Sequence, residues 1–147
     1  MRHQFPGLND GEEFPALHDQ THEVKLVGSV TGGRWTLSSN GLFATGRPYT
    51  APESEYFLDL LDGSQQSYIH VGEKNALRLA YYSRFDASVL YRFNLGLWNG
   101  TIGASVFNVL DHTNVWYREF DLSATPPLVT DVTYLGRTLN LSVGIGI

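Results

Sequence analysis

The chain has 147 residues, of which 42% are hydrophobic, 13% aromatic and 17% charged, and its formal net charge is -5. This length corresponds to one ordinary domain, and the charged share lies below the quarter that is typical of globular domains. The absence of cysteine excludes disulfide frameworks, thiolate zinc sites and cysteine nucleophiles. The negative net charge argues against a general nucleic-acid-binding surface, so we expect no nucleic-acid partner.

The N-terminal third begins with a predicted loop and continues with a predicted hairpin. Residues 1–20 are rich in Pro, Gly, Asn and Asp, which favour turns. Residues 22–30 alternate between apolar and other side chains, as expected for a strand. Residues 31–33 (Thr-Gly-Gly) predict a tight turn. A second strand begins at Trp35, and its alternation weakens after Ser39.

The next segment, residues 50–76, is long and polar and contains Pro52 and Gly63. Only residues 56–61 have a pattern that fits a turn of helix or a strand. We therefore predict a long loop, and a loop of this length in a compact domain is usually functional or disordered.

Three further strands are predicted in the second half of the chain. Residues 84–93 and 102–106 alternate clearly, and the alternation slips at Asn108. After another polar stretch, the last strand, at about residues 133–147, alternates most strictly. The predicted fold is all-β, an antiparallel up-and-down meander of about five strands with no helix longer than a turn or two.

The alternation divides these strands into two predicted faces. The apolar positions include Val24, Leu26, Phe85, Val89, Tyr91, Phe93, Leu139, Leu141, Val143 and Ile145. The charged positions of the other face are Glu23, Lys25, Arg84, Asp86 and Arg92. Both a soluble β-sandwich and a membrane β-barrel alternate in this way, so alternation alone leaves the two open.

The aromatic residues have a regular spacing along the predicted strands. Trp35 and Phe43 are eight residues apart on one face, as are Phe85 and Phe93. Eight steps span roughly 26 Å, or roughly 20 Å of height at a tilt near 40°, which is close to the apolar band of about 25 Å between aromatic girdles. Core aromatics of a sandwich also fit this spacing.

Longer stretches of the chain resemble the TonB-dependent outer-membrane receptors. Asn75–Ser88 followed by Tyr91–Phe93 is similar to late barrel strands of that family, and Gly46–Thr50 to the top of a strand. Ser105–Asp111 resembles the penultimate strand, and His18–His22 fits the segment before the first strand. The resemblance covers nearly the whole chain, and it favours the barrel.

The resemblance implies that the chain is the C-terminal segment of a transmembrane β-barrel in the bacterial outer membrane. It implies that the apolar face contacts outer-membrane lipid, that the charged face lines the lumen, and that residues 50–76 form an external loop. The family imports scarce ligands such as iron chelates, cobalamin or glycans. Two residues depart from the family pattern: Ala80 stands where Pro is frequent, and Ile147 where a terminal aromatic is usual.

The implied partners are the remaining strands of the receptor barrel, its plug domain and the barrel-assembly machinery. A TonB-type energy coupler would act only through an N-terminal part. Neither that part nor the plug is recognisable in this chain, so we expect a partial receptor that does not transport alone.

An open sheet of this kind is not expected to be stable alone in a membrane. A strand of about ten residues leaves roughly ten N–H and C=O groups at each open edge, each costing several kcal/mol in hydrocarbon. Two edges therefore cost tens of kcal/mol, against a usual net stability of about 5–15 kcal/mol. We expect missing strands, further copies, or a two-layer sheet in water to satisfy these edges.

One cluster suggests metal binding at first sight. His18, Asp19, His22 and Glu23 lie close together in the sequence. Residues four apart share a face on a helix, but in a strand they are roughly 13 Å apart. We therefore predict polar residues at the rim of the sheet and no metal site.

The remaining candidates are isolated. His3, His70 and His112 are predicted to lie in loops, and Asp59 and Asp62 lack the ligand spacing of a calcium loop. Since no catalytic constellation is present, we expect no enzyme, no catalytic residue and no cofactor. The alternative hypothesis is a small soluble all-β module that binds a glycan or a protein.

Overall fold

The computed structural model describes residues 1–124 and 126–146, and its regular elements are strands apart from one turn of 3-10 helix, η1 (Asn9–Gly11). No helix within this described part is long and apolar enough to cross a membrane. The chain divides into two compact units, which are described separately. Unit 1 comprises Met1–Thr21, Gly46–Ala80 and Val115–Thr133, and unit 2 comprises His22–Thr45, Tyr81–Asn114 and Tyr134–Ile147.

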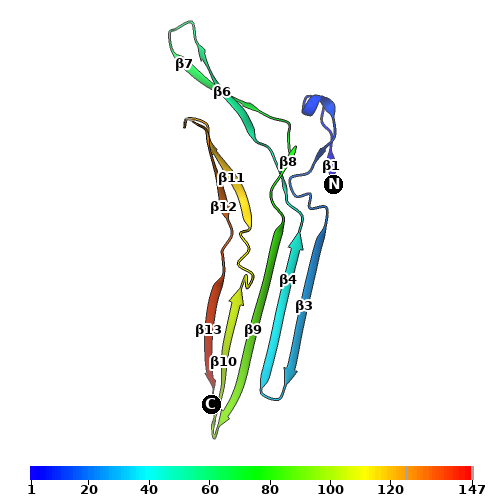
Figure 1. The fold of residues 1–147 in the computed structure, drawn as a ribbon, viewed down its shortest axis with the longest axis vertical. Coiled ribbons are helices and arrows are strands. Elements are labelled where there is room, and N and C mark those ends of the chain that lie inside the picture. Colours follow the sequence, from blue (N-terminus) through cyan, green and yellow to red (C-terminus); the bar gives the residue numbers. More distant parts are fainter. Residues whose placement is uncertain (125, 147) are drawn as a thin grey trace. The chain divides into compact units, whose positions relative to one another are not determined.

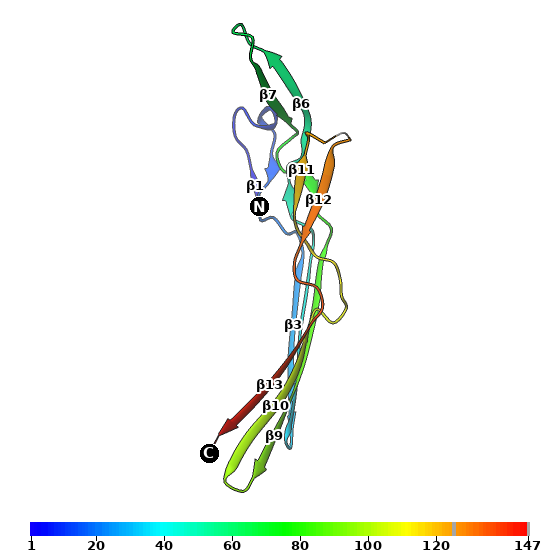
Figure 2. The same ribbon diagram turned by 90° about the vertical axis from the view of Figure 1, so that its left-hand side faces the viewer.

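Unit 2 is one antiparallel sheet of five strands in the order β13-β10-β9-β4-β3 (Figure 1). Its strands are β3 (Glu23–Gly32), β4 (Trp35–Ala44), β9 (Tyr82–Leu95), β10 (Trp98–Phe107) and β13 (Thr138–Gly146). Each strand pairs with the next one of the unit along the chain, which confirms the predicted all-β antiparallel meander. Figure 2 shows these strands as a single twisted layer.

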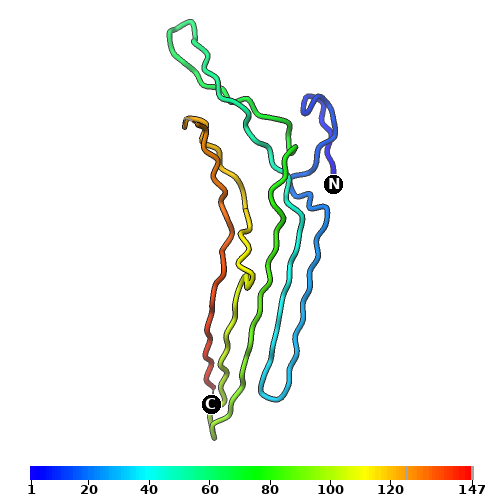
Figure 3. Tube along the Cα trace, in the orientation of Figure 1, coloured from blue at the N-terminus to red at the C-terminus, as the bar shows by residue number. Residues whose placement is uncertain are grey.

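Two tight turns connect neighbouring strands at the same end of this sheet (Figure 3). Two residues separate β3 from β4, and two separate β9 from β10. Gly33 (φ 56°) and Gly96 (φ 63°) supply the left-handed conformation that such short hairpin turns require. The connections from β4 to β9 and from β10 to β13 are long, so short turns and long connections alternate as predicted.

Unit 1 consists of two hairpins and two short strand pairs. The hairpins are β6 (Pro52–Asp59) with β7 (Gln65–Val71), and β11 (Val115–Asp121) with β12 (Leu128–Thr133). The short pairs are β1 (Arg2–His3) with β2 (Phe14–Pro15), and β5 (Pro48–Tyr49) with β8 (Leu77–Arg78). All these pairs are antiparallel.

The structure differs from the sequence analysis mainly in the long connections. Residues 50–76, predicted as a loop, contain the β6–β7 hairpin, and residues 1–20 contain β1 and β2. The last strand begins at Thr138 instead of near residue 133, because residues 128–133 pair with β11. Ile147, the predicted end of that strand, lies outside the described residues.

Two of the histidines predicted in loops are also found in strands. His3 lies in β1 and His70 in β7. Neither strand belongs to the five-stranded sheet, and both are short enough that their alternation is hidden among turn-forming residues.

Very few apolar side chains are buried. Among the described residues, the buried apolar side chains are those of Phe14, Ala16, Ala44 and Pro48. Phe14 packs beside His3 and Phe5, with ring centroids 6.2 and 6.1 Å away. The five-stranded sheet therefore leaves most of its large apolar side chains exposed, which a water-soluble domain of this size would bury.

Candidate functional site

The strand register of unit 2 aligns apolar side chains across the whole sheet. Directly paired residues of antiparallel strands have their side chains on the same face. One such row runs through Val30, Leu37, Val89, Ala104 and Leu141, one residue from each strand. The sheet consequently has one face on which apolar residues from all five strands meet.

All ten positions that the sequence assigns to the lipid side lie on this face, called here the apolar face. They are Val24, Leu26, Phe85, Val89, Tyr91, Phe93, Leu139, Leu141, Val143 and Ile145. The register adds Val30, Trp35, Leu37, Phe43, Leu95, Trp98, Ile102, Ala104 and Val106. No charged residue belongs to it within the paired strands. Most of its large members are exposed, Leu141 by 81% and Leu26 by 69%.

Aromatic rings gather at both ends of the apolar face. Near the tight turns, the rings of Trp35 and Tyr91 pack with centroids 4.6 Å apart. Near the opposite end, Tyr81 lies between Phe43 (5.6 Å) and His112 (4.7 Å), forming a stack of three rings. The predicted aromatic spacing is thus present as two separate groups.

The opposite face carries the five charged residues predicted for it. Glu23 and Lys25 form an ion pair at the start of β3. On β9, Arg84 Nε lies 3.1 Å from Asp86 Oδ2, and the Arg84 guanidinium lies 4.7 Å from the centre of the Phe107 ring. Arg92 is exposed on the same strand face. The two pairs favour a structural role for four of these charges over a chemical one.

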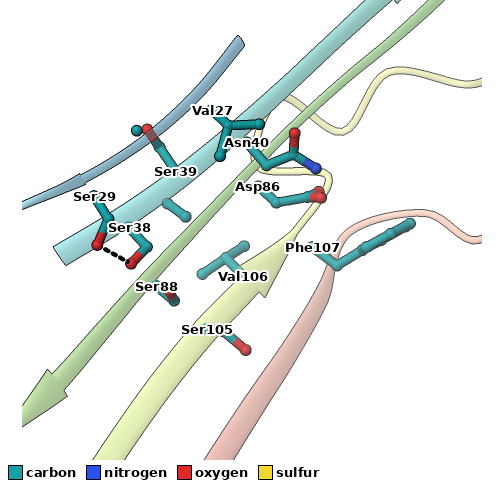
Figure 4. Close-up of a pocket in the computed structure, with 12 residues that line it drawn as sticks. Val27, Ser29, Ser38, Ser39, Asn40, Asp86, Ser88, Ser105, Val106 and Phe107 are labelled. Carbon is teal, nitrogen blue, oxygen red and sulfur yellow. Dashed lines mark hydrogen bonds between the residues drawn. The ribbon is translucent and has the colours of Figure 1, made fainter. Parts of the chain in front are cut away.

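Small hydroxyl side chains occupy the middle of this polar face. The register aligns one row as Ser29, Ser38, Ser88, Ser105 and Asn140, again one residue from each strand. Ser29 Oγ and Ser38 Oγ are hydrogen bonded at 2.9 Å (Figure 4). A shallow hollow of about 470 Å³ follows this row, because serine fills little of the space above a sheet.

Residues 108–114, called here the lock, are hydrogen bonded at the end of β9 and β10 that lies opposite the tight turns. Within the lock, Asn108 is fully buried and Asn114 is 3% exposed. The Asn108 N–H donates to Asp86 Oδ1 (3.0 Å), and its amide donates to the His112 carbonyl (3.0 Å). Asn114 accepts from the Ser83 N–H (2.8 Å) and donates to the Ser83 carbonyl (2.9 Å). The lock explains why alternation slips at Asn108.

The lock also contacts the segment immediately before β13. The backbone N–H of Tyr134 donates to the Asn114 carbonyl (2.8 Å). Asp111 accepts a hydrogen bond from the Arg137 N–H (3.0 Å) and forms an ion pair with the Arg137 guanidinium (3.3 Å). Asn108 and Asp111 both have left-handed backbone conformations (φ 52° and 53°). These contacts fix the spacing of β9, β10 and β13 at the end of the sheet that carries the long connections, opposite the tight turns.

Two of the possible metal ligands, Asp19 and Glu23, have other partners in the structure. In unit 1, Asp19 accepts from the N-terminal amine (2.8 Å) and from Arg78 (2.7 Å), and these hydrogen bonds lower the pKa of the Asp19 carboxyl. Residues 1–124 and 126–146 contain no group of three or more His, Asp or Glu side chains that could hold a metal ion. Asp19 therefore acts as a structural anchor for the segment before β3.

The two carboxylates that the sequence places in the long loop, Asp59 and Asp62, accept hydrogen bonds at the turn of the β6–β7 hairpin. Asp62 accepts hydrogen bonds from the Ser64 hydroxyl (2.6 Å) and the Ser64 N–H (2.9 Å), which lower the pKa of its carboxyl. Asp59 accepts from the amide of Gln65 (2.8 Å). Leu61, at the tip of the same turn, is fully exposed. Both carboxylates thus have hydrogen-bond partners within the hairpin.

Three buried asparagines are the main residues that sequence reasoning missed. Asn108 and Asn114 build the lock, and in unit 1 Asn75 donates to the Pro15 carbonyl (2.8 Å) and accepts from the Thr50 hydroxyl (3.3 Å). The sequence carried a signal only for Asn108, which stands where the period-two pattern breaks.

Comparison of the chain with protein-family models, curated proteins and solved structures gives no match.

Proposed function

We propose that unit 2 is a membrane-spanning wall segment of a β-barrel in the bacterial outer membrane. The carrying observation is the apolar face, which is uncharged, runs through all five strands and is covered by no second layer of the unit (Figure 2). Five strands about 4.8 Å apart and about 30 Å long give a face of roughly 700 Å². The largest apolar patch of a typical water-soluble monomer is about 300–600 Å².

Strand length and aromatic placement support the same proposal. Four of the strands have 9 or 10 residues and β9 has 14. A strand that crosses a bilayer at a tilt needs about 9–11 residues. The ring groups at Trp35–Tyr91 and Phe43–Tyr81–His112 stand at opposite ends of the apolar face, where aromatic girdles flank the lipid band of such barrels.

The polar face suits the inside of a barrel. Its serine row, Gly103, Gly144 and Gly146 leave little side-chain volume on this face, and Arg84 and Asp86 form an ion pair within β9. In outer-membrane barrels, polar residues face the interior and apolar residues face lipid. A lumen lined by small polar groups lets another polypeptide or a solute lie close to the wall.

The proposed whole is a receptor of the TonB-dependent type that imports a scarce ligand such as an iron chelate, cobalamin or a glycan. The resemblance of residues 75–93 and 105–111 supports this assignment. Part of the second stretch belongs to the lock, so its residues also have a structural role. In this proposal the β6–β7 and β11–β12 hairpins belong to external connections. The remaining barrel wall, a plug and an energy coupler act together with this segment, and transport requires all of them.

Membrane extraction tests the proposal directly. The chain is produced with an export signal in a Gram-negative host, and outer membranes are washed with alkaline carbonate. The proposal predicts that the chain stays with the membrane and needs detergent for release. A well-dispersed monomer in detergent-free buffer would instead support the all-β binding module and contradict the membrane assignment.

A further inference from the structure

The side-chain charges of unit 2 are paired at one end of the sheet and unpaired at the other. Its acidic residues, Glu23, Asp86 and Asp111, lie away from the tight turns, and each forms an ion pair with a basic residue. Among the described residues of this unit, the basic side chains without an ion pair are Arg34 and Arg92, and both are exposed. Both lie close to the tight turns, one directly before β4 and the other near the end of β9. This end of the sheet is therefore positively charged, although the whole chain has a net charge of -5.

Arg34 stands where the apolar face meets the turn between β3 and β4. Its carbonyl accepts the backbone N–H of Arg92 (2.8 Å), which ties the turn to β9. Its Nη1 donates to the Tyr91 hydroxyl (3.4 Å). Tyr91 belongs to the apolar face and pairs directly with Trp35, on whose ring it packs. The Arg34 guanidinium therefore lies on the side of the sheet that carries the apolar face.

The donors of this group have few acceptors in the described part of the chain. A guanidinium carries five N–H donors, and in Arg34 the Tyr91 hydroxyl is the acceptor of one of them. No described carboxylate forms an ion pair with Arg34. Tyr91 accepts from Arg34 and keeps its own hydroxyl proton for another acceptor. The neighbouring Trp35 is half-exposed and carries an indole N–H, which is a donor only. Two strands thus place three donor groups side by side at the rim of an apolar surface.

A phosphate group has the charge and the acceptors that these donors fit. The planar fork of arginine binds phosphate through two parallel hydrogen bonds. A free phosphate ion would leave the exposed rings of Trp35 and Tyr91 in water. A phospholipid instead covers such rings with its acyl chains and brings its phosphate to their polar edge, where tryptophan and tyrosine are enriched in membrane proteins. The long arginine side chain reaches from the apolar surface to the same depth.

We propose that Arg34, Tyr91 and Trp35 bind the phosphate of a phospholipid headgroup at the membrane surface beside the tight turns. The inference rests on the proposed function, which places the apolar face in lipid. In outer-membrane barrels the short turns lie on the periplasmic side, so the bound lipid belongs to the periplasmic leaflet. An aromatic girdle by itself requires no particular headgroup, whereas this site requires a phosphate.

Solid-state NMR dephasing between arginine and lipid phosphorus tests the contact. The full chain, with arginine labelled at the guanidinium carbon, is reconstituted in vesicles of phosphatidylethanolamine and phosphatidylglycerol. Arg34→Gln removes the fork from the site. Arg92→Gln is the matched control, because it removes the other unpaired charge of the same end from the polar face. We expect an arginine signal that lipid phosphorus dephases, which is lost in Arg34→Gln and retained in Arg92→Gln.

A second measurement separates the lipid from a free phosphate ion. The labelled chain is transferred to micelles of an uncharged sugar detergent and titrated with inorganic phosphate, while the arginine and indole signals are recorded. We expect no saturable shift, because the ion leaves the rings uncovered. A saturable shift at millimolar phosphate that disappears in Arg34→Gln would assign the site to a soluble phosphate and overturn the lipid inference.

The outcomes distinguish this inference from the function on which it rests. Carbonate extraction of the same vesicles reports whether the chain is in the membrane. A chain that resists extraction but has no dephased arginine signal, or loses that signal equally in both variants, would overturn the headgroup site and leave the membrane assignment intact. A chain that carbonate removes from the vesicles would contradict the membrane assignment, and the headgroup site with it.

Discussion

An arginine in the middle of the apolar face should distinguish a lipid-facing surface from a water-facing one. Leu141 lies in the middle of β13 and is 81% exposed. On a water-facing surface, Leu141→Arg should change the free energy of unfolding by no more than about 0.5 kcal/mol. On the lipid side of a barrel near the bilayer midplane, the same change costs about 2–4 kcal/mol.

A cost of about 2–4 kcal/mol corresponds to a factor of about 30 to 700 in the equilibrium between inserted and unfolded chains. Urea-induced unfolding from lipid vesicles measures it, with every variant made in the same parent chain. Ser142→Arg, one residue further along on the polar face, is the matched control and should cost much less. Equal losses for the two variants, or no loss for Leu141→Arg, would refute the assignment of the faces.

Three further predictions concern the lock, a close contact and a turn. Asn108→Ala should lower the free energy of unfolding by about 1–3 kcal/mol, because the buried hydrogen bond from its side-chain amide to the His112 carbonyl is lost, and urea titration measures it. Gly100→Ala should cost about 1–3 kcal/mol, because its Cβ would lie 2.2 Å from the Phe93 ring; Gly28→Ala, whose Cβ meets only a hydroxyl at 3.6 Å, should be nearly neutral in the same titration. The lowered pKa of Asp62 means that its bonds to Ser64 stabilise the turn above the ordinary value of 3.8 and weaken as the pH falls through the lower folded value. An NMR titration of the Ser64 N–H should show this change, and a shift unchanged down to pH about 2 would contradict it.

The sheet could be predicted because its strands alternate strictly. In residues 84–93 and 139–145 each second side chain is apolar, and the register then places all ten predicted residues on one face. The tight turns were predictable from Gly33 and its neighbours. Assigning the residues to the two faces required only the period of two. A shift of one residue in register would have exchanged the two faces.

The hairpins of unit 1 and the lock could not be predicted in the same way. Tyr56 and Tyr68 stack across the β6–β7 hairpin, with ring centroids 5.8 Å apart, but the contact joins residues twelve apart on either side of a polar turn. Asn108 is buried where its backbone N–H donates to the side chain of Asp86, which lies 22 residues earlier in the sequence. Such long-range hydrogen bonds leave no periodic signal in the sequence, so an asparagine in this position reads as a turn residue.

The most direct test of the central claim is a cysteine scan of β13 in lipid vesicles. Single cysteines are placed at residues 139–145, labelled with a fluorophore and quenched with brominated lipid or with an aqueous quencher. The account predicts a period of two, with residues 139, 141, 143 and 145 quenched by lipid and residues 140, 142 and 144 not. Uniform quenching by the aqueous reagent along the whole strand would contradict a membrane-spanning sheet.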